Sequence, residues 1–124
     1  MNSNLLLQTS AWLLVVTAAG GLVMAFIRFG REGSNPPAWL AMLHGFLAAA
    51  GVTLLAFAAL TAGIPGLALT GLVLLLVASG GGVVMNLGYH LKGVPLPGWL
   101  VGLHAALAAG GVLMVLLAAI GARS

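Results

Sequence analysis

Four long apolar segments, separated by short stretches rich in glycine, proline or charge, dominate the pattern along the chain. The segments cover about residues 5 to 29, 38 to 62, 67 to 91 and 98 to 121, and the stretches between them contain GREGSNPP, GIPG and KGVPLP. Because a helix needs roughly 20 apolar residues to cross a bilayer, the pattern predicts an all-α protein with four transmembrane helices. Connections this short favour antiparallel neighbours, so we expect an up-and-down four-helix bundle.

The composition excludes a water-soluble protein. Of the 124 residues, 62% are hydrophobic and 4% are charged, and a single residue is acidic, so the chain cannot cover itself with a polar surface. We therefore treat residues 1–124 as a single membrane domain. The leading sequence MNSNLLLQ carries no basic residue, unlike a cleavable signal, and we expect the first segment to remain as a helix. The absence of cysteine removes disulfides, thiolate metal sites and cysteine nucleophiles.

The basic residues indicate an orientation in the membrane. The formal net charge is +3, but the four basic residues lie near helix ends and form no face that could follow phosphates, so we exclude nucleic acid as a partner. Arg28, Arg31 and Lys92 adjoin the first and third connections, whereas Arg123 follows the last segment. This excess of Lys and Arg predicts that the two connections lie in the cytoplasm of a bacterium, with both termini on the outer side of the inner membrane.

Two parts of the sequence occur twice. PAWLAMLHGFLAAAG at residues 37–51 matches PGWLVGLHAALAAGG at 97–111, and AAGGLVMAF at 18–26 matches SGGGVVMNL at 79–87. The repeated unit is therefore a helical hairpin. Because each copy crosses the membrane twice, the two copies are related by an axis along the membrane normal.

Two such hairpins, at about 5–62 and about 67–121, place the first and third helices on one diagonal of the bundle and the second and fourth on the other. Each hairpin carries one histidine in its second helix, His44 or His104. Counted at 1.5 Å per residue from the preceding proline, each histidine lies about 10 Å inside its helix. The two side chains are then expected to face each other across the bundle.

Small residues lie next to the histidine layer. Alanine and glycine follow each histidine at four and seven positions, on the same helix face, and glycine clusters occur at a similar height in the preceding helices. These positions predict a slot that is nearly free of side chains. Its lining is expected to include Gly21, Gly51, Gly81 and Gly111.

Two interpretations of the histidine pair remain open at this stage. In the first, small residues let the helices approach closely and each imidazole makes an interhelical hydrogen bond. In the second, His44 and His104 are metal ligands that hold one haem iron from opposite sides. Diagonal helices are roughly 11–14 Å apart, and two imidazoles with a metal between them need about 13 Å. Arg28 would then pair with the haem carboxylates.

The remaining candidates also have two interpretations each. Met24 and Met85 fall in the histidine layer, either as soft ligands for haem or Cu(I) or as packing residues. Asn86 could orient an imidazole or join two helices. His90 has no counterpart in the first hairpin and is interpreted as an interfacial residue. The one acidic residue, Glu32, lies in a loop, so the membrane segments contain no carboxylate and we expect no catalytic activity of the chain on its own.

Paired histidines in the second and fourth helices, each within WLxxLH and followed by small residues, resemble the small membrane-anchor and b-type cytochrome subunits of bacterial respiratory complexes. The resemblance implies that His44 and His104 are axial ligands of one haem b. It predicts an electron-transfer subunit in the lipid bilayer, with membrane or peripheral redox proteins as partners and quinone as a candidate partner. The alternative function is a structural or assembly subunit of a larger membrane complex, without a cofactor of its own.

Overall fold

The four apolar segments form four helices, as the sequence predicts. The computed structural model describes residues 2–30 and 34–122. Its elements are α1 (Ser3–Gly30), α2 (Ala38–Thr61), α3 (Gly66–Gly88), a short 3-10 helix η1 (His90–Lys92) and α4 (Gly98–Gly121). The third apolar segment, expected to continue to residue 91, therefore changes from α-helix to 3-10 helix near its end. The all-α, four-helix fold class is confirmed.

Proline and glycine set the boundaries of the helices. Pro37, Pro65 and Pro97 each stand immediately before the first residue of a helix. Proline suits this place because its fixed φ is helical and the amide hydrogen that it lacks would have no partner inside the helix. Gly63 and Gly93 have φ angles of 74° and 66°, which other residues rarely adopt, and they turn the chain between helices.

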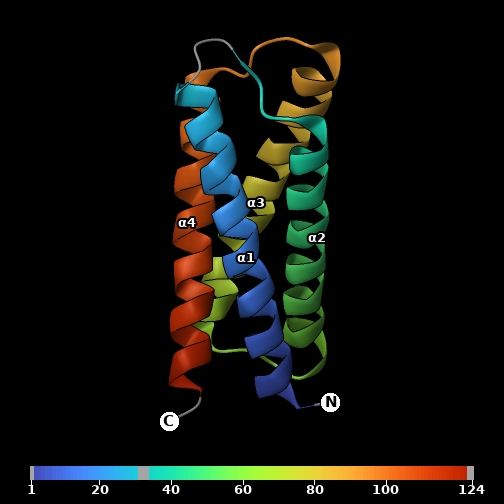
Figure 1. Cartoon of the computed structure of the whole chain (residues 1–124). Coiled ribbons are helices and arrows are strands. Elements are labelled where there is room, and N and C mark those ends of the chain that lie inside the picture. Colours follow the sequence, from blue (N-terminus) through green and yellow to red (C-terminus); the bar gives the residue numbers. More distant parts are fainter. Residues whose placement is uncertain (1, 31–33, 123–124) are drawn as a thin grey trace.

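The helices run up and down around a common axis (Figure 1). α1 packs on α2 and α4, and α3 packs on α4 and α2, so α1 and α3 lie on one diagonal and α2 and α4 on the other. This is the arrangement expected from the sequence. The beginning of α1, the α2–α3 connection and the end of α4 lie at one end of the bundle, called here the terminal end (Figure 1). The α1–α2 and α3–α4 connections lie at the opposite end, called here the loop end.

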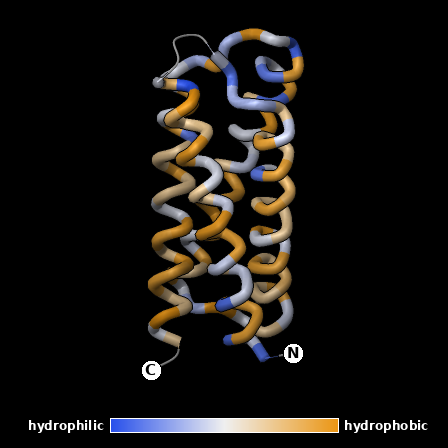
Figure 2. The backbone as a smooth tube through the Cα atoms, viewed as in Figure 1, coloured by the Kyte–Doolittle hydropathy of each residue, from blue (hydrophilic) through white to orange (hydrophobic). Residues whose placement is uncertain are grey.

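Hydrophobic residues occur along most of the length of the helices (Figure 2), and many of them are exposed on the outside of the bundle. Large side chains such as Leu60, Phe26 and Trp39 are 87%, 74% and 67% exposed. All four helices are long and apolar enough to cross a membrane. Exposed aliphatic and aromatic surface of this extent is unfavourable in water, whereas hydrocarbon accommodates it, so the fold is that of a membrane-spanning bundle.

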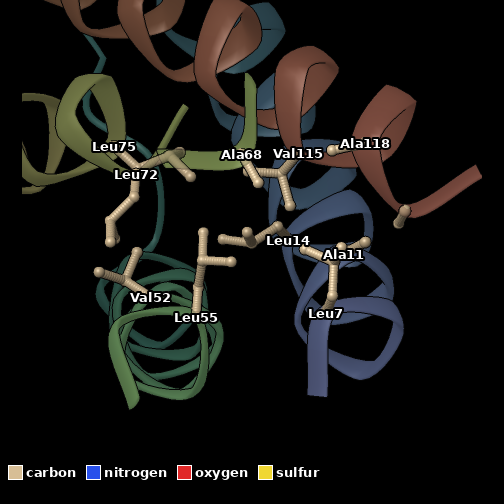
Figure 3. Close-up of a cluster of buried hydrophobic side chains, with 11 residues drawn as sticks. Leu7, Ala11, Leu14, Val52, Leu55, Ala68, Leu72, Leu75, Val115 and Ala118 are labelled. Atoms are coloured by element: carbon tan, nitrogen blue, oxygen red, sulfur yellow. The ribbon is translucent and has the colours of Figure 1, made fainter. Parts of the chain in front are cut away.

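The closely packed core occupies the terminal half of the bundle. Leu7, Leu14, Leu55 and Val115 are almost completely buried there and come from three different helices (Figure 3). The hydroxyl of Ser10 donates a buried hydrogen bond of 2.8 Å to the carbonyl oxygen of Gly51 and thereby joins α1 to α2. This half of the molecule is filled by side chains, which leaves the loop half as the place where the helices enclose a cavity.

Candidate functional site

A cavity of about 520 Å³ lies among the four helices in the loop half of the bundle. Its volume is within the range of roughly 300–1,000 Å³ that is common for ligand sites. Both predicted ligands, His44 and His104, line it together with Met24, Met85 and Gly21. The structure thus gathers in one cavity the residues that the sequence placed in one layer.

His44 and His104 face each other across this cavity. Their ring centroids are 6.2 Å apart and their ring planes meet at 67°. The rings belong to α2 and α4, which lie diagonally opposite each other in the bundle. The space between the rings is therefore close to the bundle axis. The expectation that the two side chains come together across the bundle agrees with this geometry.

Each imidazole is held by one hydrogen bond to the backbone of the preceding helix. Nδ1–H of His44 donates to the carbonyl oxygen of Thr17 at 2.9 Å, and Nδ1–H of His104 donates to that of Ala78 at 2.8 Å. A carbonyl oxygen only accepts, so the proton must reside on Nδ1. In the neutral ring, Nε2 then carries an unshared electron pair, and the hydrogen bond fixes both tautomer and orientation, as is usual for a metal-ligating histidine.

Glycine makes these two hydrogen bonds possible. In an α-helix the carbonyl of residue i lies beside residue i+4, whose Cβ points back toward it. Gly21 and Gly82 occupy the i+4 positions relative to Thr17 and Ala78. A Cβ at Gly21 would lie 3.0 Å from Cε1 of His44, and a Cβ at Gly82 would lie 3.3 Å from Cε1 of His104. The missing side chains leave room for the imidazoles to reach the carbonyl oxygens.

The same set of contacts recurs in both hairpins. The histidines are 60 positions apart, whereas their glycine neighbours Gly21 and Gly82 are 61 positions apart. Deeper in the bundle, a Cβ at Gly51 would meet Leu14 at 2.9 Å, and a Cβ at Gly111 would meet Leu75 at 2.7 Å. Gly51 and Gly111 are again 60 positions apart, and Leu14 and Leu75 are again 61 positions apart. The imidazole positions therefore follow a local arrangement that the sequence specifies twice.

Gly51 and Gly111, which were expected to line the slot beside the histidines, lie instead at contacts between helices. Gly51 and Gly111 lie where α2 meets α1 and where α4 meets α3, and Val52 and Val112 line the cavity at that depth. Gly81 lies beside the slot: a Cβ there would be 3.9 Å from Nδ1 of His104. Gly82 is closer to the imidazole. The sequence does contain a sign of this role: Gly82 lies 61 positions after Gly21, the same separation as between the matching segments 18–26 and 79–87.

The loop end of the cavity is polar. Nε–H of Arg28 donates to the carbonyl oxygen of Leu96 at 2.8 Å, and Nε2–H of His90 donates to that of Pro36 at 2.8 Å. The Asn35 side chain joins the same two connections through hydrogen bonds with Val94 and Leu96. His90, Pro36, Leu96 and Asn86 all line the cavity. Arg31 lies outside the described residues.

The cavity is least enclosed between α2 and α3. α4 packs more extensively on α1 than α3 packs on α2. Met42 and Phe46 of α2 and Val83 and Leu87 of α3 line the cavity, yet each is about half exposed or more on the surface of the bundle. The α2–α3 wall is therefore the side on which residues that line the cavity also reach the outer surface of the bundle.

Chemically, the site offers the imidazoles of His44 and His104 with that of His90 at its loop end, the thioethers of Met24, Met42 and Met85, and a largely apolar enclosure. Within residues 2–30 and 34–122, no group of three or more His, Cys, Asp or Glu side chains could hold a metal ion. That count leaves methionine aside, and the thioethers of Met24 and Met85 line the same cavity as His44 and His104. A metal that already carries most of its ligands, and needs only two axial ones, would suit the pair.

Comparison with protein-family models, curated proteins and solved structures finds no match for this chain. The class of the protein is described from its fold and its site. They describe a four-helix bundle that can span a membrane and that encloses a cavity between two opposed histidines.

Proposed function

We propose that the protein is a membrane electron-transfer subunit that binds one b-type haem through His44 and His104. The observation that carries this proposal is the distance of 6.2 Å between the two ring centroids. Two imidazoles bound through Nε2 to opposite sides of one iron have centroids about 6.2–6.4 Å apart, given a metal–nitrogen bond of about 2.0–2.1 Å and about 1.1 Å from nitrogen to ring centre. Such a pair leaves the angle between the ring planes free, so 67° is compatible with it.

The chemistry of the donors also fits a haem. Both Nδ1 atoms are engaged with backbone carbonyls, so both Nε2 atoms keep a free electron pair. Haem bound in this way supplies a reversible one-electron couple, and the protein tunes it through axial ligands, hydrogen bonds and burial. Met24 and Met85 line the cavity beside the histidines, and as packing residues they would contact the porphyrin edge. Gly21 and Gly81 leave room, while Gly51 and Gly111 support the site only through helix packing.

The alternative, a structural or assembly subunit without a cofactor, is supported by the two imidazole–carbonyl hydrogen bonds. Such bonds join helices in membranes and contribute about 0.6 kcal/mol each. This alternative accounts for the orientation of each ring but leaves the cavity of about 520 Å³ between them unexplained. Close packing would be expected to fill that space.

A redox titration tests the electron-transfer proposal. The protein, purified in detergent from cells with ample haem supply, should give a b-type reduced-minus-oxidised spectrum and should titrate as a single one-electron centre. Two components of equal amplitude would indicate two haems per chain, which one histidine pair cannot hold. A protein without visible absorption would favour the assembly alternative.

We also propose that the loop end faces the cytoplasm and that both termini lie outside it, in a bacterial inner membrane. Arg28 and Lys92 lie at the loop end, and positive charge is retained on the cytoplasmic side during insertion. Alkaline phosphatase fused to the C-terminus should therefore be active. An inactive phosphatase, together with an active cytoplasmic reporter at the same point, would reverse the orientation.

Partner proteins would exchange electrons with the haem from the surfaces nearest to it. The less closely packed α2–α3 wall would give a lipid-soluble carrier such as quinone, or a second membrane protein, an approach to the histidine pair. The loop end offers a small polar surface to a peripheral redox protein. The matching contacts of the two hairpins further support their origin as an internal repeat.

A further inference from the structure

The two ends of the cavity differ in chemistry. Toward the terminal end it is closed mainly by the aliphatic side chains of Leu14, Val52, Leu75 and Val112, and the hydroxyl residues Thr17 and Ser79 line it nearer the histidines. Toward the loop end it is bounded by the side chains of Asn86 and His90 and by residues of the two connections. A ligand that fills the cavity would meet hydrocarbon at one edge and polar groups at the other.

Asn86 has an unused hydrogen-bonding group in this polar part. Its carboxamide lines the cavity from within α3, and it makes no hydrogen bond with any of the described residues. Asn86 is partly buried, and because no fully buried side-chain nitrogen or oxygen among the described residues lacks a partner, its amide is accessible to a ligand in the cavity. The equivalent position in the first hairpin is Ala25, so this place in the bundle does not require a polar side chain. Polar groups at such sites are functional candidates.

Arg28 does not itself line the cavity, but it brings a positive charge to the same end. Its Nε–H donates to the carbonyl oxygen of Leu96, a residue that lines the cavity. A guanidinium has five N–H donors, and this bond uses one of them. Among the described residues no carboxylate pairs with Arg28, since Glu32, the single acidic residue of the chain, lies outside them. The remaining donors form a fork that suits a carboxylate.

We propose that Arg28 and Asn86 bind the two carboxylates of the porphyrin, so that the carboxylate edge faces the loop end and the vinyl and methyl edge faces the aliphatic terminal end. This inference rests on the proposed haem. It accounts for the unpaired amide of Asn86, for the cation beside the cavity and for the difference between the two ends. Charge-assisted hydrogen bonds of this kind are roughly twice as strong as neutral ones.

Esterified haem tests this assignment directly. The full chain, produced without added haem, is titrated with ferric haem and with its dimethyl ester, which has the same iron and ring but no charge at the carboxylates. The unmodified protein should bind the ester about 10-fold more weakly or worse. In R28Q and in N86A the ratio of haem affinity to ester affinity should fall to about 3-fold or less, because a side chain that binds a haem carboxylate has been removed. K92Q removes an exposed charge at the same end and should keep the full ratio.

Each other outcome is decisive. Equal affinity of the unmodified protein for haem and ester overturns the assignment while leaving haem binding intact. Equal weakening of haem and ester binding by R28Q would mean that Arg28 only holds the connection at Leu96, which also overturns its role. If the unmodified protein binds neither compound, the proposed function itself fails. If R28Q does not insert, N86A carries the same test, because its alanine matches the natural residue at position 25.

Discussion

Replacing His44 or His104 with alanine should abolish six-coordinate, low-spin haem. Each imidazole supplies one of the two axial ligands in the proposed site, and the Nε2 of His90, the other histidine that lines the cavity, is engaged with the carbonyl oxygen of Pro36. Each single variant is expected to carry five-coordinate haem or none, and the double variant none. The visible spectrum and the haem content per chain measure this effect, because low-spin and high-spin haem differ in both oxidation states.

His90 gives a matched control for these variants. It lines the same cavity, but its Nε2 donates to the carbonyl oxygen of Pro36, so replacement with alanine should leave the haem six-coordinate. Adding free imidazole to H44A or H104A should restore the low-spin spectrum, since the small ligand can occupy the vacated space. Single histidine variants that retain an unchanged low-spin spectrum would contradict the assignment of both ligands.

Replacing Gly82 with leucine should lower haem affinity by about 10- to 100-fold, as expected from the usual cost of overpacking. A Cβ alone would lie 3.3 Å from Cε1 of His104, and the branched side chain would push the imidazole from its carbonyl acceptor. Gly21 occupies the equivalent position beside His44, and leucine there should have a similar effect. Haem content after purification, compared with helix content from circular dichroism, separates loss of the site from loss of the fold.

Gly20 and Gly80 provide controls for the same substitution. Each belongs to a glycine cluster, and a Cβ at either position would meet no atom within 4 Å. Leucine at these two positions should leave the haem content unchanged. If the Gly82 and Gly21 variants also retain full haem content, the imidazoles are not held as described.

Much of the fold could be predicted because membrane helices are specified by simple features. Apolar length gives the helices, Pro37, Pro65 and Pro97 give their starts, and short connections give the diagonal arrangement. The approach of His44 to His104 follows from that arrangement together with the sequence repeat. None of these steps requires knowledge of how individual side chains pack.

The details of the site depend on helix rotation, which the sequence leaves open. Gly51 lies seven residues after His44, nearly two helical turns, and so on nearly the same face. At that depth, however, α1 approaches α2 closely enough for Leu14 to pack on Gly51, and Val52 faces the cavity in its place. The carbonyl acceptors at Thr17 and Ala78 were equally hidden, because every helical residue carries a carbonyl. A glycine four residues later accompanies both, but Val16 and Val77 share that feature through Gly20 and Gly81, so it does not single them out.

The measurement closest to the central claim is the electron paramagnetic resonance spectrum of the oxidised, purified protein, with the signal quantified per chain. One iron held between His44 and His104 predicts a low-spin ferric haem signal that accounts for one haem in each chain, with no high-spin component. A high-spin signal would mean that at most one histidine binds the iron. A correctly inserted protein with no haem signal, produced with ample haem, would contradict the cytochrome function and leave the histidines as hydrogen-bonding residues between helices.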